Sequence, residues 1–135
     1  MTTDMVNHPT HYTSHKSGVE CIVFSRYLPA SLANTFKYVW RCGEKGNPVQ
    51  DLQKALWYLR DYKNYPVGIT EDAANELGLG LVVHEEGFNR EVLQDSVLLT
   101  IIGIATVPEA YKYDLLSLAE HRLSSLIKHY EGLSP

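Results

Sequence analysis

Apolar residues recur at helical spacing along most of the chain, and this pattern predicts the fold. The expected helices cover approximately residues 18–28, 32–41, 48–62, 71–77, 90–107 and 109–130. Residues 21–24 could instead form a short strand, and residues 81–88 fit either a strand or the start of a helix. Residues 1–17 are polar and rich in His and Thr, so we expect an irregular arm there. The sequence therefore predicts an all-α fold: a small helical bundle of five or six helices with an irregular N-terminal arm.

Capping and turn-forming residues define the expected helix ends. Three polar residues precede helical segments and suit the N-cap position: Ser31, Thr70 and Asn89. Pro48 suits the first turn of a helix, and Gly43 follows the preceding helix at the position where a left-handed residue is favoured. The short acidic helix 71–77 is expected to end at Gly78 and Gly80.

The stretch from Asn34 to Tyr58 organises the chain, because two predicted helices meet there at a Gly-rich turn. On the first helix, the stripe opposite the apolar one is formed by Asn34, Lys37, Tyr38 and Arg41, at spacings i, i+3, i+4 and i+7. In the turn, Gly43 and Gly46 bracket Lys45 and could present backbone amides to an anion. On the second helix, one face carries Asp51, Lys54 and Tyr58. The short connection predicts that the two helices are antiparallel neighbours.

Folding this hairpin back on itself is expected to gather four cations around one space: Lys37, Arg41, Lys45 and Lys54. Asn34 and Asp51 are expected at the rim of that space. Cations with a carboxylate and an amide nearby suit a ligand that carries phosphate groups. The competing interpretation is a solvated helix face on which the stems of the lysines cover apolar surface.

The charge of the chain is divided unevenly between its two halves. Residues 1–65 hold eight Lys and Arg against five Asp and Glu, a net charge of +3, whereas residues 66–135 hold four against eleven, a net charge of −7. The change coincides with Tyr65-Pro66-Val67-Gly68, the clearest break in the chain. We therefore expect a basic domain over residues 1–65 and an acidic helical region over 66–135 that packs on it or forms oligomer contacts. The balance disfavours general binding to nucleic acid and favours a small anion in one basic pocket.

Neither a membrane span nor a secretory signal is visible in the sequence. No apolar run approaches the roughly 20 residues that a membrane helix needs, and the N-terminus lacks a basic segment followed by an apolar one. The two cysteines, Cys21 and Cys42, form neither a disulfide framework nor a zinc set. We therefore expect a cytoplasmic protein with no membrane partner.

Two further groups of residues invite a metal or catalytic interpretation. The arm contains His8, His11 and His15, whose spacing could suit a metal site. Alternatively, one of these histidines could carry a phosphoryl group, or His11 and Tyr12 could fold over the mouth of a pocket. Farther along, four acidic residues occur close together: Glu85, Glu86, Glu91 and Asp95. Glu91 and Asp95, at i and i+4, would share one helix face, as do the acidic pairs that hold Mg²⁺ in helical pyrophosphatases. Acidic residues at a helix N-terminus are also favoured by the helix dipole alone, so no metal ligand is assigned. The phosphate-binding sequence G-x-x-x-x-G-K-[ST] is absent.

Four motifs in order carry a family resemblance. They are Val6-Asn7-His8-Pro9-x-His11-Tyr12, Gly18-Val19-Glu20-Cys21-Ile22, Asn34-x-x-Lys37-Tyr38-x-x-Arg41-x-Gly43-x-Lys45 and Asp51-Leu52-x-Lys54-Ala55-x-Trp57-Tyr58. In combination, over about residues 6–65, they resemble a family of small tailed-phage proteins. That family includes a Walker-less deoxynucleoside monophosphate kinase, which transfers a phosphoryl group to dTMP and dGMP. The resemblance implies a phage-type nucleotide kinase with a nucleoside triphosphate as donor and Mg²⁺ as a possible cofactor.

We assign roles within this activity from chemistry. The expected catalytic residues, which hold the phosphates and orient charge, are Lys37, Arg41, Lys45 and Asp51. The expected substrate-binding residues are His11, Tyr12, Asn34, Tyr38, Gly43 and Lys54. Asp51 is expected to orient Lys54 or Mg²⁺, and His11 and Tyr12 are expected to close over the base. Replacing Arg41 with Ala should lower turnover by a factor on the order of 10² while leaving the fold intact.

Two other functions are consistent with the sequence. One is a phage protein that binds a nucleotide or inhibits a host protein without turnover, and the other is an all-α nucleoside triphosphate pyrophosphatase that holds its metal on the acidic residues. In each case the expected partners are nucleotides, with a homo-oligomer if the last helix exposes an apolar stripe.

Overall fold

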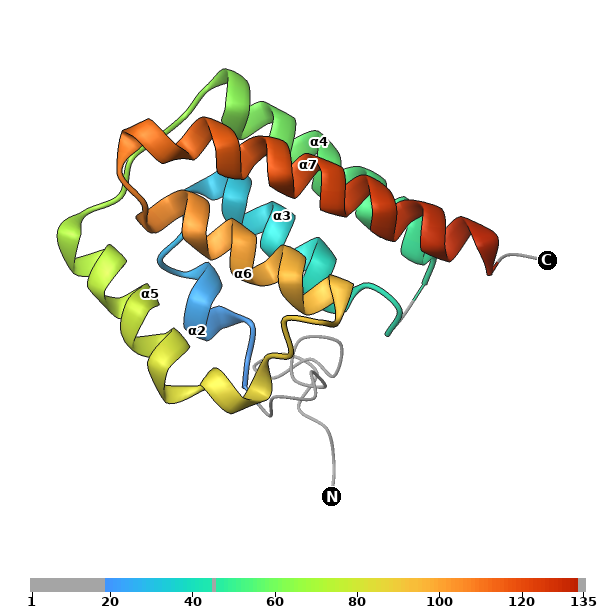
Figure 1. Ribbon diagram of the computed structural model, residues 1–135, viewed down its shortest axis with the longest axis horizontal. Helices are drawn as coiled ribbons and strands as arrows, with labels where there is room; N and C mark the ends of the chain where they lie inside the picture. Colours follow the sequence, from blue (N-terminus) through green and yellow to red (C-terminus); the bar gives the residue numbers. More distant parts are fainter. Residues whose placement is uncertain (1–18, 45, 134–135) are drawn as a thin grey trace.

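The computed structural model describes residues 19–44 and 46–133, and within these ranges the fold is entirely helical (Figure 1). Its elements are α2 (Ile22–Ser25), α3 (Ala30–Arg41), α4 (Pro48–Asn64), α5 (Glu71–Val83), the 3₁₀ turn η1 (Glu85–Gly87), α6 (Leu93–Thr106) and α7 (Glu109–Gly132). No strand occurs in the described ranges, so the predicted all-α bundle is confirmed. The expected N-terminal arm lies outside the described residues.

Two antiparallel hairpins build the bundle. The first consists of α3 and α4 and the second of α6 and α7, and Figure 1 shows α7 running along α4 while α6 packs against α3. The short helix α2 packs against α3, and α5 lies at one side of the bundle against α2 and α6. The hairpin predicted between residues 34 and 58 therefore forms half of the bundle.

One buried core contains residues from both halves of the chain. Phe36 of α3, Leu59 of α4, Ile101 of α6 and Leu123 of α7 are all fully buried within it. Burial of a side chain of this size stabilises the fold by about 1.5–3 kcal/mol. Residues after position 65 therefore complete the core on which the first hairpin rests.

Several predicted helix ends are confirmed. Thr70 caps α5 by accepting a hydrogen bond from the backbone N–H of Ala73, at 3.1 Å. Pro48 occupies the first turn of α4, and Asn47, which sequence analysis did not single out, caps that helix. Gly43 follows α3 with a φ of +86°, in the left-handed region that only glycine adopts readily.

Other predicted ends are wrong, because tertiary contacts take over the capping residues. Ser31 does not cap α3; it lies inside the helix, and its hydroxyl donates to the Asp61 carboxylate of α4. Asn89 does not cap α6, which begins at Leu93; its side chain instead accepts a hydrogen bond from the Glu91 backbone N–H, at 3.0 Å, in the preceding turn.

Helix α5 also runs past its predicted end and through both glycines to Val83. Gly80 is buried in that helix, and a Cβ placed on it would lie 2.9 Å from the ring of Phe24. The glycine therefore serves the close approach of an aromatic ring and does not end the helix. No helix in the described part of the chain is both long enough and apolar enough to cross a membrane.

Candidate functional site

Side chains from both helices fix the geometry of the α3–α4 hairpin. Near its open end, Ser31 of α3 is bonded to Asp61 of α4. In the middle, the hydroxyl of Thr35 is bonded across to the Ala55 carbonyl at 3.3 Å. These contacts hold the two helices side by side. The polar stripe of α3 therefore lies beside the face of α4 that carries Asp51, Lys54 and Tyr58.

An ion pair joins the two helices near the turn. A guanidinium nitrogen of Arg41 donates to Oδ1 of Asp51 at 2.9 Å. The side chain of Arg41 remains 30% exposed, whereas that of Asp51 is only 4% exposed. The second carboxylate oxygen, Oδ2, is buried and bonded to no atom in the described part of the chain. Asp51 is therefore the buried member of the pair, and Arg41 reaches from it toward solvent.

Two tyrosine rings, one from each helix of the hairpin, lie next to this ion pair. The guanidinium carbon of Arg41 lies 4.9 Å from the centre of the Tyr38 ring, and the ammonium of Lys54 lies 5.6 Å from the same centre. The ring of Tyr58 stacks on that of Tyr38, with centroids 6.1 Å apart and planes inclined by 14°. Cations over aromatic faces are attracted by the ring quadrupole. We call Tyr38, Arg41, Asp51, Lys54 and Tyr58 the hairpin cluster.

The end of α3, which carries Arg41, is held in place from α6. The side-chain amide of Gln94 donates to the carbonyl of Val39 at 2.7 Å and lies 3.3 Å from that of Cys42. Both carbonyls lie at the end of α3, where the regular backbone hydrogen bonding of the helix stops; that of Val39 also accepts from the Cys42 backbone N–H, at 3.3 Å. Gln94 therefore fixes the last turn of α3, a role that nothing in its sequence position indicated.

Burial keeps two groups near this helix end neutral, the thiol of Cys42 and the phenol of Tyr130. Burial raises the pKa of the Cys42 thiol to about 11, with a smaller rise from the charge of Asp51. Burial likewise raises the pKa of Tyr130, which is hydrogen-bonded to Cys42, to about 12. At neutral pH the charges in this region are therefore those of Arg41, Lys54 and the carboxylates, and neither the thiol nor the phenol adds to them.

The structure brings together four of the predicted site residues: Tyr38, Arg41, Asp51 and Lys54. Asp51 was expected at the rim, but it is buried and bonded to Arg41. Asn34 and Lys37 lie on the half-buried polar stripe of α3, but no described contact joins them to the hairpin cluster. Gly43 lies exposed in the turn after α3, with a φ of +86°. The remaining predicted residues, His11, Tyr12 and Lys45, lie outside the described residues.

The two acidic residues that invited a metal interpretation, Glu91 and Asp95, do not lie on one helix. Glu91 lies in the turn before α6, and Asp95 is buried in the first turn of that helix, where it accepts a hydrogen bond from the Asn89 backbone N–H at 3.0 Å. The carboxylate of Asp95 therefore orders the preceding loop. Among the described residues, no group of three or more His, Cys, Asp and Glu side chains could hold a metal ion.

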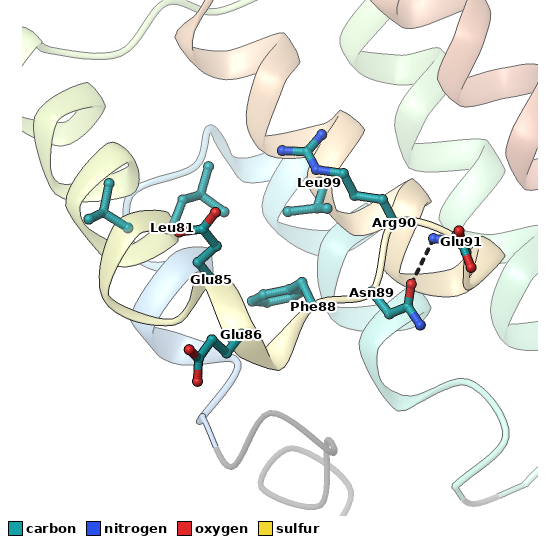
Figure 2. A pocket seen from close by; sticks show the side chains of 9 residues that line it. Leu81, Glu85, Glu86, Phe88, Asn89, Arg90, Glu91 and Leu99 are labelled. Carbon is teal, nitrogen blue, oxygen red and sulfur yellow. Dashed lines mark hydrogen bonds between the residues drawn. The ribbon is translucent and has the colours of Figure 1, made fainter.

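A cavity of about 730 Å³ lies elsewhere, between the end of α5, η1 and α6 (Figure 2). Leu81, Phe88 and Leu99 supply apolar side chains to it, while Glu85 and Arg90 bring opposite charges to its walls. This cavity could not be predicted from the sequence, because the segment from 81 to 91 has no clear periodicity. It contains no residue of the hairpin cluster.

Comparison with known proteins gives one family match. A model of the family DUF3310, described as a protein family of unknown function, matches residues 6–60, less than half of the chain. No curated protein and no solved structure matches the chain. The matched segment contains the whole hairpin cluster, so this family shares with the chain the stretch that carries the candidate site.

Proposed function

We propose that the chain is a nucleotide-binding phosphotransferase of phage type, which transfers a phosphoryl group from a nucleoside triphosphate to a deoxynucleoside monophosphate. The observation that carries the proposal is the hairpin cluster, in which one cation from each helix lies over the same tyrosine ring. Lys54 is exposed and Arg41 partly so, and a phosphate group from solvent can therefore approach both.

The buried carboxylate supports this function by fixing the arginine. An arginine side chain has many rotamers in water and loses their entropy when it binds a ligand. Asp51 holds Arg41 in one arrangement before any ligand arrives, so less ordering remains to be done on binding. The planar guanidinium suits the oxygens of a phosphate, and Lys54 adds a second charge beside it.

Phosphoryl transfer needs positioned charge more than covalent help from the protein. In the proposed step, a phosphate oxygen of the monophosphate forms a bond to the γ-phosphorus of the donor while the bond between the β–γ bridging oxygen and that phosphorus breaks. The products are two nucleoside diphosphates. Arg41 and Lys54 would offset the charge on the transferred group, and Lys37, Lys45 and Asn34 would complete the phosphate site as the sequence predicts. We place this activity in the cytoplasm of an infected cell.

A nucleotide-binding module without turnover is the second candidate. It is favoured by the ion pair between Arg41 and Asp51, because a carboxylate bonded to the arginine withdraws part of the positive charge that a transition state would need. Such a module could sequester a nucleotide or present it to a host protein.

A phosphotransfer assay separates the two candidates. Purified protein is incubated with ATP and either dTMP or dGMP, and diphosphates are measured by ion-exchange chromatography. We expect dTDP or dGDP from the wild type. In Lys54→Gln we expect a kcat/KM lower by a factor of about 10², because the cation that offsets the charge of the transferred group is lost. Lys63→Gln is the matched control, since Lys63 lies on α4 but contacts Tyr113 and Glu120 of α7.

Three outcomes are informative. Diphosphate formation that falls in Lys54→Gln but not in Lys63→Gln supports the phosphotransferase. Nucleotide binding without diphosphate formation supports the binding module. A protein that binds neither dTMP nor ATP contradicts both.

A further inference from the structure

Trp57 occupies an unusual place on the surface. Its side chain is 63% exposed on α4, whereas Trp40, the other tryptophan of the chain, is 1% exposed in the core. An indole buries a large apolar area when it is covered, so leaving it in water forgoes much of the stabilisation that it could give. Packing within the fold therefore does not account for tryptophan at this position.

The exposed indole is joined to the hairpin cluster through a series of rings. Trp57 meets Tyr58 edge to face, with centroids 5.1 Å apart and planes inclined by 84°. Tyr58 in turn stacks on Tyr38, whose ring lies under Arg41 and Lys54. The edge contact fixes the indole, and Trp57 stands one helical turn from the ammonium-bearing Lys54 on the same helix. A flat apolar surface and a pair of cations thus occur side by side.

We propose that Trp57 is the platform on which the base of the bound nucleotide stacks, while Lys54 and Arg41 hold its phosphate. The proposal deepens the function proposed above and rests on it. An aromatic platform recognises the π-face that every base has and does not read the hydrogen-bonding edges. The site would therefore accept purine and pyrimidine nucleotides with similar affinity, and nucleotides would bind more tightly than sugar phosphates that lack a base.

The test compares two ligands that share a phosphate but differ in the base. dTMP and 2-deoxyribose 5-phosphate are titrated into ¹⁵N-labelled full-length protein, and dissociation constants are taken from the amide shifts. In the wild type we expect dTMP to bind more tightly than the sugar phosphate. Trp57→Ala should weaken dTMP binding by about 5- to 100-fold, because stacking is lost, and should leave 2-deoxyribose 5-phosphate binding unchanged. Trp57→Phe should retain part of the dTMP affinity.

The control is Tyr111→Ala, because Tyr111 has a similar exposure of 60% but lies on α7. It should change neither dissociation constant. Circular dichroism melting of each variant shows that it is folded, as expected for replacement of an exposed side chain.

The contrary outcomes are distinct. The base platform is overturned if Trp57→Ala weakens the binding of both ligands equally, or if the wild type binds both ligands with equal affinity. Either result leaves the phosphate site standing. Absence of dTMP binding in the wild type overturns the platform and the proposed function together. If Trp57→Ala leaves dTMP binding unchanged but lowers the mass in light scattering, the indole is a contact between copies of the chain, and the platform is overturned.

Discussion

Removal of Arg41 should destabilise the protein, contrary to the expectation from sequence that Arg41→Ala leaves the fold intact. The side chain of Asp51 is 4% exposed, and the Arg41 guanidinium at 2.9 Å is the partner of its Oδ1. Breaking a fully buried pair by removing one partner costs about 3–5 kcal/mol, because a charge is left buried without compensation. Arg41 is itself 30% exposed, so its removal admits water to the carboxylate. We therefore expect a loss of about 2–3 kcal/mol in the free energy of unfolding, at or below the lower end of that range.

Urea unfolding followed by circular dichroism measures this loss. For a chain of this length, it corresponds to a decrease in Tm of about 8–10 °C. The variant Asp51→Asn should lose less, about 1 kcal/mol, since it leaves a partly exposed arginine and no buried charge. In the double variant Arg41→Ala/Asp51→Asn, the loss should be smaller than the sum of the two single losses by at least 1 kcal/mol.

Two results would refute this reasoning. One is an unfolding free energy that does not change in Arg41→Ala, and the other is strict additivity in the double variant. If the reasoning holds, lost activity in Arg41→Ala has a structural component. The exposed Lys54 is then the better residue for testing phosphate binding, because its replacement leaves no buried charge behind.

Three further predictions concern the region around the hairpin cluster. Gln94→Ala should lower the free energy of unfolding by about 1–3 kcal/mol in urea titrations, because the end of α3 loses its donor. Gly43→Ala should lower the free energy of unfolding more than Gly46→Ala does. Both glycines have a positive φ, but only at Gly43 would an added Cβ meet another group, a tyrosine hydroxyl at 2.8 Å. Equal losses in the two variants would contradict this. Burial raises the pKa of Cys21 to about 12 and that of Cys42 to about 11, from 9.0. The stability that the fold gains by keeping these thiols neutral is complete below pH 9. It is lost as the pH rises toward 11–12, by up to about 1.4 kcal/mol per pH unit for each thiol. A urea midpoint that is equal at pH 8 and pH 10.5 would contradict this prediction.

The helices and the hairpin could be predicted because local signals agree there. The apolar stripe of α3, the left-handed Gly43 and the first-turn Pro48 all indicate two helices joined by a tight turn. The meeting of Arg41, Lys54 and Tyr38 follows from that arrangement, since residues three and four apart share a helix face. This part of the site was therefore visible in the sequence.

The remaining features depend on contacts between distant segments. Ser31 has the character of an N-cap, but Asp61, thirty positions away, takes its hydroxyl. Gln94 carries no signal in the sequence, and its role exists only because α6 packs against the end of α3. Asp51 was placed at a rim by helical spacing, which cannot say how deeply a helix face is buried. Propensity and periodicity describe single elements, and such contacts are decided by packing between them.

The location of nucleotide binding tests the central claim most directly. dTMP is titrated into ¹⁵N-labelled protein, and the shifted backbone amides are mapped on the structure. We predict that the largest shifts fall on α3 and α4 around Tyr38, Arg41 and Lys54. Shifts that gather instead around the cavity between α5 and α6, or no shifts at millimolar dTMP, would contradict the claim that the hairpin cluster binds nucleotide phosphates.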